Sequence, residues 1–375
     1  MTLDRRQLLS AFALTGAAAL AGCSSDSSGG AEDEPQGTDP ETTSDPTPSS
    51  APTTREPVAP RVESTIVSRV NVPWGIAFLA SRDALVSERD RARIIKVSPE
   101  GDKSDIGTVD GVDTDAGEGG LLGIALTPDE SQLYAYFTSD EDNRVVRMSF
   151  DGRRLGRART VLTGIPRSTF HNGGRIAFGP DRQLYVTTGD AGETGNAMDR
   201  DSLAGKILRL TPAGKPAPGN PFDNEAWSIG HRNIQGIAWD QDDRLWATEF
   251  GNNRIDELNQ IVRGKNYGWP EVEGRGRNDK YVNPKATWPT DVCSPSGLAI
   301  ARSTAFVAGL RGESLYSVAL NGTSAAKPKR LFNGRYGRIR TIAVAPDGAL
   351  WMTTSNTDGR ADPGRSDDRI LRVTI

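Results

Sequence analysis

The chain has 375 residues, of which 36% are hydrophobic and 25% are charged, and its net charge at pH 7 is −4. The acidic residues are concentrated near the N-terminus, so residues 61–375 alone carry a net charge of +2. This near-neutral balance argues against nucleic-acid binding, which requires a clear surplus of basic residues. The two cysteines, Cys23 and Cys293, are too few for a metal site built from several thiolates.

Residues 1–22 have the pattern of an export signal. Arg5 and Arg6 precede an apolar run at 11–21, which is too short to span a bilayer as a mature helix. The arginine pair is typical of twin-arginine signals. The sequence Leu-Ala-Gly-Cys at 20–23 resembles a bacterial lipobox, so we expect Cys23 to be lipidated. An ordinary signal peptide cleaved nearby is the alternative. We therefore expect an exported lipoprotein, anchored to the outer face of the cell membrane, in which Cys293 lacks a disulfide partner.

Residues 23–60 are predicted to be a disordered linker. After Cys23 the segment is rich in Ser, Thr and Pro, and it has eight acidic residues against one basic residue. Large apolar side chains are almost missing, so the segment cannot bury enough surface to offset the entropy cost of ordering. The folded domain is therefore expected to span residues 61–375.

Residues 61–375 contain a degenerate repeat whose core is a hydrophobic triplet with alanine in the middle. The triplets begin at residues 76, 124, 176, 237, 298 and 342. Most are followed by a turn rich in Asp, Pro or Gly and then by a second and a third strand-like segment. Strand-rich repeats of this length predict an all-β fold, a six-bladed β-propeller. Residues 62–67 are expected to add the outer strand of the last blade and close the ring. A β-sandwich is the alternative, but it does not explain six copies in one order.

The repeat also predicts where polar residues gather. In a propeller the chain enters the first strand of every blade from one face, and the loops between second and third strands open onto that face. Glu118, His171, residues 231–235 and residues 338–340 precede triplets, whereas residues 249–256 and Arg311 lie in the second kind of loop. We therefore expect one polar mouth at the central channel, and such concave sites bind ligands.

The chain has only two histidines, His171 and His231, and each lies in a glycine-flanked polar cluster ahead of a triplet. Histidine titrates near neutral pH, so it is the usual proton carrier in catalysis. A histidine that merely caps a strand is the simpler interpretation of either one, so the surrounding residues must decide.

The motifs resemble those of the soluble PQQ-dependent glucose dehydrogenases and aldose sugar dehydrogenases, also called glucose/sorbosone dehydrogenases. The resemblance covers residues 61–375 and runs through segments 72–75, 119–123, 171–175, 205–209, 220–222, 230–236 and 264–270. It implies a PQQ- and Ca²⁺-dependent enzyme that oxidises the anomeric hydroxyl of an aldose to a lactone by hydride transfer. No Cys-x-x-Cys-His haem motif is present, so electrons are expected to pass to an external acceptor.

The resemblance also implies roles for the central residues. His171 would be the general base that takes the proton of the anomeric hydroxyl. Arg232 would lie against the quinone oxygens and stabilise the negative charge that develops there. Asn233 and Gln235 would hydrogen-bond the cofactor or the sugar. His231 would position Arg232 or line the cofactor pocket.

PQQ is a tricarboxylate, so its pocket needs fixed positive charge. Arg338 and Arg340 match the paired arginines of the family, and Arg311 stands where the family usually has lysine. Thr290 matches a threonine that touches the cofactor.

The calcium at the cofactor would be held by main-chain carbonyls at Gly251 and Asn252, where the family has Gly-Pro; oxygen donors suit calcium. Asp256 matches a carboxylate near this site. Glu257 and Tyr267 match positions around a second, structural calcium.

Two positions depart from the glucose enzyme. Glu118 replaces a glutamine that contacts the sugar, and Phe170 replaces an aspartate directly before the base. Both changes favour a broader aldose activity over glucose preference. They also favour the main alternative, a non-catalytic propeller that binds a sugar or a cell-wall ligand. A calcium-dependent lactonase propeller is a third possibility, although its cluster of inward carboxylates is not evident in the sequence.

Overall fold

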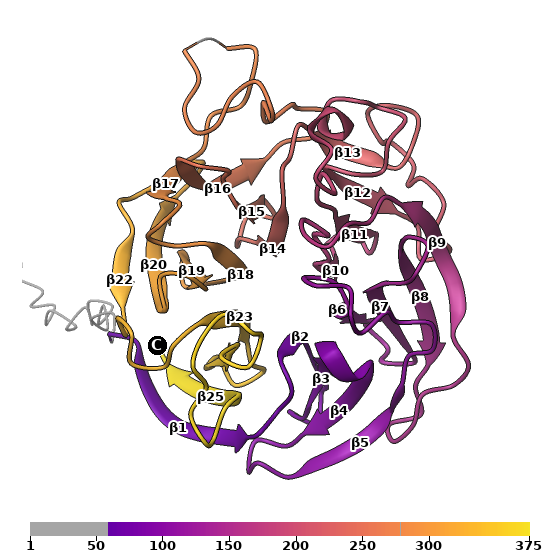
Figure 1. Ribbon diagram of the computed structural model, residues 1–375, viewed down its shortest axis with the longest axis vertical. Coiled ribbons are helices and arrows are strands. Elements are labelled where there is room, and N and C mark those ends of the chain that lie inside the picture. The colour runs from indigo at the N-terminus through magenta and orange to yellow at the C-terminus, as the bar shows by residue number, and fades with distance from the viewer. Residues whose placement is uncertain (1–58, 278) are drawn as a thin grey trace, which may run out of the picture. The chain divides into compact units, whose positions relative to one another are not determined.

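The computed structural model describes residues 59–277 and 279–375, which form six antiparallel sheets arranged as blades around one axis (Figure 1). The prediction of an all-β, six-bladed propeller is therefore confirmed. The predicted signal peptide, Cys23 and residues 23–58 of the predicted linker lie outside the described residues. Within the described part, no helix is long and apolar enough to cross a membrane.

In the first four blades the strands run from the axis outward in chain order, and each blade has four of them. They are β2 (Pro73–Phe78), β3 (Ala84–Glu88), β4 (Arg93–Val97) and β5 (Lys103–Thr108); β6 (Leu121–Leu126), β7 (Gln132–Thr138), β8 (Asn143–Ser149) and β9 (Arg159–Ile165); β10 (Ile176–Phe178), β11 (Leu184–Thr187), β12 (Lys206–Leu210) and β13 (Ala226–Ile229); and β14 (Ile234–Trp239), β15 (Leu245–Glu249), β16 (Ile255–Ile261) and β17 (Ala286–Pro289). The alanine-centred triplets lie in the innermost strands, as the repeat predicts.

The last two blades differ at their outer edges. The fifth blade contains β18 (Pro295–Ala301), β19 (Thr304–Gly309), β20 (Ser314–Asn321), β21 (Ser324–Ala325) and β22 (Lys329–Leu331), and the last two both pair with β20. The sixth contains β23 (Ile339–Val344), β24 (Leu350–Thr354), β25 (Arg369–Thr374) and β1 (Arg61–Ser68). The antiparallel pairing of β1 with β25 closes the ring with the N-terminal strand, as expected.

Each blade is buried on both faces because it packs between two neighbours. Alternation along β7 shows how the sequence achieves this: Leu133 and Ala135 enter the core between the first and second blades, whereas Tyr134 and Tyr136 enter the core between the second and third. Successive side chains of a strand point to opposite faces, so both sets must be apolar. A separate cluster of this kind fills every interface between neighbouring blades.

Glycines ahead of the triplets let the inner strands approach closely. A side-chain carbon added at Gly123 would lie 2.2 Å from the carbonyl oxygen of Gly174 in the next blade. One added at Gly236 would lie 2.4 Å from the carbonyl oxygen of Ser296. Because real contacts of this kind are never so short, these positions require glycine. A glycine at this repeated position therefore lets neighbouring inner strands lie in close contact.

Arg175 ties four blades together near the axis. From the third blade its guanidinium donates to the carbonyl oxygens of Gln235 (2.9 Å) and Trp74 (3.3 Å) and to Oγ1 of Thr341 (3.0 Å). It also lies 4.1 Å from the centre of the Trp74 ring. Burial, with the charge of Arg340, lowers the pKa of Arg175 to about 9. The side chain of Arg175 thus bridges the channel between four blades.

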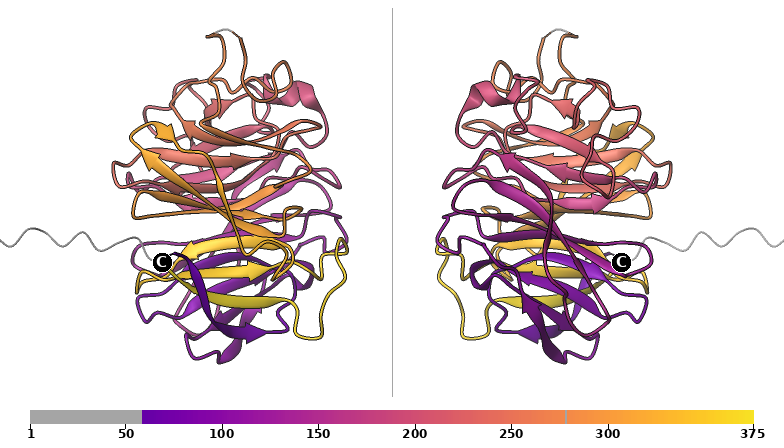
Figure 2. Two further views of the ribbon diagram at one scale, coloured as in Figure 1. Left: turned by 90° about the vertical axis from the view of Figure 1, so that its left-hand side faces the viewer. Right: turned by 90° about the vertical axis from the view of Figure 1, so that its right-hand side faces the viewer.

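Long loops join β11 to β12 and β24 to β25, the second and third strands of the third and sixth blades. Side views show the loop between β24 and β25 projecting beyond the strands (Figure 2). Two short 3₁₀ segments, Arg89–Arg91 and Thr194–Ala197, lie in the loops between the second and third strands of their blades. The loops between the second and third strands of the first, fourth, fifth and sixth blades, with segments ahead of the inner strands, form the walls of the site described next.

Candidate active site

A cavity of about 660 Å³ opens at the channel mouth. It is lined by most of the residues that the sequence singled out: Glu118, His171, Arg232, Asn233, Gln235, Gly251, Asn252, Asp256, Thr290, Arg311, Arg338 and Arg340. They come from blades two to six, so only the propeller's ring could bring them together. Phe170, Glu257 and Tyr267 are not part of this lining.

His171 is held by a carboxylate that the sequence analysis missed. Its Nδ1 lies 2.8 Å from Oδ1 of Asp190, a buried residue in the loop after β11. The Asp190 carboxylate also accepts the indole N–H of Trp269 (2.8 Å) and the amide of Gly192 (2.9 Å). Burial alone would raise the pKa of Asp190, but the hydrogen bonds from His171, Gly192 and Trp269 lower it overall. An ionised Asp190 assigns the proton to Nδ1, leaving Nε2 able to accept one.

The backbone around His171 explains its glycine-flanked motif. His171 has a φ of 58°, in the left-handed region that side chains other than glycine rarely adopt. A side-chain carbon at Gly189 would lie 1.8 Å from the carbonyl oxygen of His171. The motif thus holds the histidine against the loop that carries Asp190.

His231 does not reach the cavity. It is fully buried, with Nδ1 2.9 Å from Oε2 of Glu249 and Nε2 2.8 Å from Oγ of Ser228, and its ring stacks on Tyr267. The other oxygen of Glu249 accepts the backbone amide of Arg232 at 2.6 Å. His231 is therefore linked to Arg232 through Glu249, which fits the first of its two expected roles. It does not line the cavity.

Arg232 projects into the cavity beside the candidate calcium loop. Its guanidinium donates to the carbonyl oxygen of Gly251 (2.7 Å) and to Oδ1 of Asn252 (3.3 Å), and it lies over the ring of Trp269. Its Nε is buried and finds no hydrogen-bond partner among the described residues. Burial lowers the pKa of Arg232, although the nearby carboxylates oppose this. The side chain therefore has donor capacity that the protein leaves unused.

The side-chain oxygens of Asn233 and Gln235 accept hydrogen bonds from other residues of the protein. Oδ1 of Asn233 accepts the amide of Gly173 at 3.0 Å. Oε1 of Gln235 accepts Nη1 of Arg340 and Oγ of Ser296, both at 2.9 Å. Both side chains fix the cavity walls through their oxygens.

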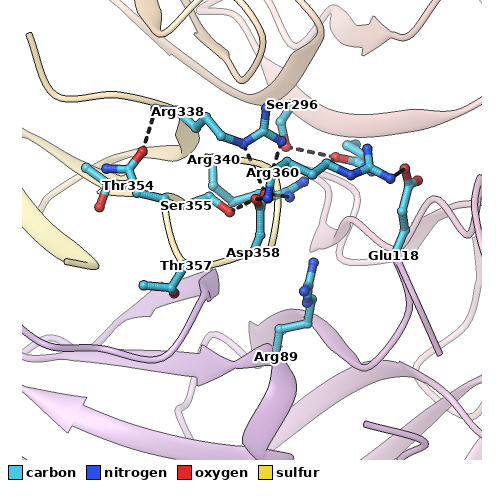
Figure 3. A network of polar contacts seen from close by, with 12 residues as sticks. Arg89, Glu118, Ser296, Arg338, Arg340, Thr354, Ser355, Thr357, Asp358 and Arg360 are labelled. Carbon is cyan, nitrogen blue, oxygen red and sulfur yellow. Dashed lines mark hydrogen bonds and ion pairs between the residues drawn. The ribbon is translucent and has the colours of Figure 1, made fainter. Parts of the chain in front are cut away.

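Asp358 pairs with both Arg338 and Arg340, and the sequence analysis did not identify it (Figure 3). Its Oδ2 lies 3.0 Å from Arg338 and 3.3 Å from Arg340. Burial alone would raise the pKa of Asp358, but the two arginines and the hydroxyl of Ser355 lower it overall. Burial lowers the pKa of Arg340 to about 10, and its buried Nε has no hydrogen-bond partner within residues 59–277 and 279–375.

Positive charge exceeds negative charge around the cavity. Six arginines line it (Arg89, Arg232, Arg311, Arg338, Arg340 and Arg360), against four carboxylates (Glu118, Asp256, Glu313 and Asp358). Burial further raises the pKa of Asp256 to about 7, which weakens its charge near neutral pH. Together with the unpartnered Nε atoms, this surplus suits an anionic ligand, and a tricarboxylate such as PQQ fits the charge of the site.

The candidate calcium loop is held from two sides. Asp256 accepts the amide of Gly251 (2.9 Å) through one oxygen and that of Ser294 (2.7 Å) through the other. A single oxygen of Glu273 accepts the amides of residues 252–255, at 2.8–3.1 Å. Among described residues, no three His, Cys, Asp or Glu side chains form a metal cluster. Main-chain carbonyl oxygens that border the cavity are ligands of the kind that calcium prefers. In this structure, however, the carbonyl oxygen of Gly251 accepts a hydrogen bond from Arg232.

Glu257 and Tyr267 line a smaller, adjoining pocket with Glu249 and Glu273. Burial and the charge of Glu249 raise the pKa of Glu257 above its ordinary value. The hydroxyl of Tyr267 donates to the carbonyl oxygen of Gln260 at 2.7 Å. The prediction of a second calcium there stays a prediction.

The two departures from the family lie beside His171. Phe170 is 42% exposed, and its ring meets that of His171 edge-on at 4.6 Å. Glu118 accepts the backbone amide of His171 (3.3 Å) through one oxygen and pairs with Arg360 (2.7 Å) through the other. The outer part of the cavity thus combines an apolar ring with an ion pair.

Comparison with known proteins gives consistent results. A family model described as glucose/sorbosone dehydrogenase matches residues 70–371. The PQQ-bound aldose sugar dehydrogenase of Streptomyces coelicolor is 52% identical, with a TM-score of 0.81, over 84% of this chain and 97% of that one. Aldose sugar dehydrogenase YliI of Escherichia coli is 29% identical over 65% of this chain and 76% of that protein. Quinoprotein glucose dehydrogenase B of Acinetobacter calcoaceticus is 31% identical, over 59% of this chain and 54% of that protein.

Proposed function

Since the chain belongs to the glucose/sorbosone dehydrogenase family of PQQ-type sugar oxidoreductases, we propose that it oxidises aldoses to lactones with His171 as general base. PQQ, when bound, supplies the acceptor for the hydride that leaves C1 of the sugar. The observation that carries the proposal is the His171–Asp190 pair facing a cavity with surplus arginines. A protein that only bound sugar would need neither a proton acceptor nor an anion pocket beside it.

The chain's own residues divide the work. Nε2 of His171 takes the proton of the anomeric hydroxyl, while Asp190 fixes the ring and stabilises its positive charge after protonation. Arg232 offers positive charge where negative charge develops in the reaction. Arg311, Arg338 and Arg340 bind the cofactor's carboxylates, with Asp358 keeping the last two in place.

Calcium is part of the proposal, held by the carbonyls of Gly251 and Asn252. Bound there, it would act as a Lewis acid on the cofactor. Because Arg232 donates to the Gly251 carbonyl, calcium binding would require Arg232 to give up this hydrogen bond. Asp256 and Glu273 hold the loop in either case.

Reconstitution tests the activity. The purified full chain is loaded with PQQ and Ca²⁺, and reduction of an electron-accepting dye is measured with a panel of aldoses. We expect turnover with several aldoses that depends on both additions. Failure to bind PQQ, or binding without turnover on any aldose, would refute the proposed activity.

We also propose that the protein is exported and anchored through lipidated Cys23, and that it passes electrons to an external acceptor. The support is the signal-like sequence of residues 1–23 and the lack of a haem motif. A Cys23→Ser variant should leave the membrane fraction and lack the mass of a lipid in mass spectrometry. Equal membrane association of variant and wild type would contradict the anchor.

A further inference from the structure

Arg360 spans the substrate side of the mouth from the opposite wall. It lies in the loop between β24 and β25 of the sixth blade, and its guanidinium reaches Oε1 of Glu118 from the second blade at 2.7 Å. Figure 3 shows Arg360 extending toward Glu118, and Arg89 lies below both in this view. Both partners line the cavity.

The loop that carries Arg360 is fixed to the arginine pair. Oδ1 of Asp358 accepts the backbone amide of Arg360 at 3.1 Å. Oδ2 of the same carboxylate bonds Arg338, Arg340 and the hydroxyl of Ser355. The position of Arg360 is thus set by residues that we assign to the cofactor pocket.

Glu118 connects this arginine to the candidate base. One of its oxygens pairs with Arg360, and the other accepts the backbone amide of His171. The side chain of Arg360 is 59% exposed, and exposed ion pairs add little to the stability of a fold. This pair spans a ligand cavity beside the candidate base. It therefore affects the electrostatic field that a substrate meets more than it affects the stability of the fold.

We propose that Arg360 is a specificity-determining residue, which neutralises Glu118 at the mouth and so favours uncharged aldoses. This inference rests on the proposed function. With the pair intact, the charges of Arg360 and Glu118 largely cancel, so a neutral sugar meets hydrogen-bond donors and acceptors at this edge of the mouth. Without Arg360, the Glu118 carboxylate attracts a cationic sugar and repels an anionic one, at distances where such forces change rates several-fold.

The test compares kcat/KM for D-glucose, D-glucosamine and D-glucuronate in the reconstituted full chain. In Arg360→Ala we expect the glucosamine-to-glucose ratio to rise, and the glucuronate-to-glucose ratio to fall, by about fivefold each at low salt. Both changes should shrink as ionic strength rises. Adding Glu118→Gln to this variant should return both ratios toward the wild-type values.

Arg372→Ala is the matched control. Arg372 forms ion pairs of 2.8 Å with Glu63 and 2.7 Å with Asp347, but on outer strands and turns that do not line the cavity. It should leave both ratios unchanged. If wild type is active but Arg360→Ala keeps the wild-type ratios, the inference is wrong and the proposed function stands. Wild type that oxidises none of the sugars refutes both.

Discussion

His171 and His231 occupy equivalent places in successive blades. Each precedes the first strand of its blade, and each has Nδ1 bonded to a carboxylate at or just after the end of the second strand. Their Nε2 atoms differ: that of His231 is bonded to Ser228 in the core, whereas no described residue hydrogen-bonds that of His171, which lines the cavity. The same histidine–carboxylate unit therefore leaves Nε2 unbonded at the cavity in the third blade and is buried in the core in the fourth.

Replacing His171 should have the largest effect. We expect His171→Gln to lower kcat by a factor of about 10² or more, because the general base is lost. PQQ affinity should stay within a few-fold of wild type, since the arginines proposed to bind it are untouched. Dye reduction gives the first quantity and titration of apo-protein with PQQ gives the second. A variant with wild-type turnover would show that the base lies elsewhere.

Asp190→Asn should come next. The imidazole would lose the charge that fixes its tautomer and stabilises its protonated form, so we expect kcat to fall by about 10- to 100-fold. The matched control is Glu273→Gln, which alters a carboxylate that holds the candidate calcium loop without touching His171. Its KM and kcat should respond to added Ca²⁺, whereas calcium should not rescue Asp190→Asn. Rescue of both variants would remove the special role of Asp190.

His231→Gln should act mainly on the cofactor. The change breaks the bond that orients Glu249, which in turn holds the Arg232 backbone. We expect the Kd for PQQ to rise by about 3- to 10-fold, with kcat at saturating PQQ changed by less than that. Unchanged affinity would separate His231 from Arg232.

The smallest effect concerns stability and pH. The pKa of Asp190 is lowered because its hydrogen bonds outweigh its burial. A carboxyl group whose pKa is lowered by folding stabilises the fold at pH values above its ordinary pKa of about 4. This contribution is lost as the pH falls through the lower pKa of the folded protein. We expect Asp190→Asn to reduce the Tm by about 2–4 °C at pH 7, with the gap closing toward pH 3. Calorimetry across this range measures it, and a constant gap would contradict the assignment.

The sequence was most informative where the repeat fixed the geometry. Alanine-centred triplets located the six inner strands, and the rule that loops share a face placed His171, Arg232 and Arg338 on one cavity. That rule also applies to Asp190, which follows the second strand of its blade. Asp190 was missed because a loop aspartate looks the same as turn residues such as Asp181, which bonds its own loop.

Other features depended on side-chain direction, which no pattern records. His231 shares its motif with the residues that line the cavity, yet its ring turns into the core and stacks on Tyr267. Asp358 and Arg360 belong to a long loop without repeat character, so only the folded chain brings them to Arg338 and Glu118. Residues that act through such loops need coordinates to be recognised.

The most direct test of the account compares the two histidine variants under one condition. Both are loaded with saturating PQQ and Ca²⁺ and mixed with saturating aldose, and the rate of cofactor reduction is followed by stopped-flow absorbance. We expect His171→Gln to be slower than His231→Gln by at least about tenfold. Equal rates, or a slower His231→Gln, would contradict the assignment of His171 as the proton acceptor.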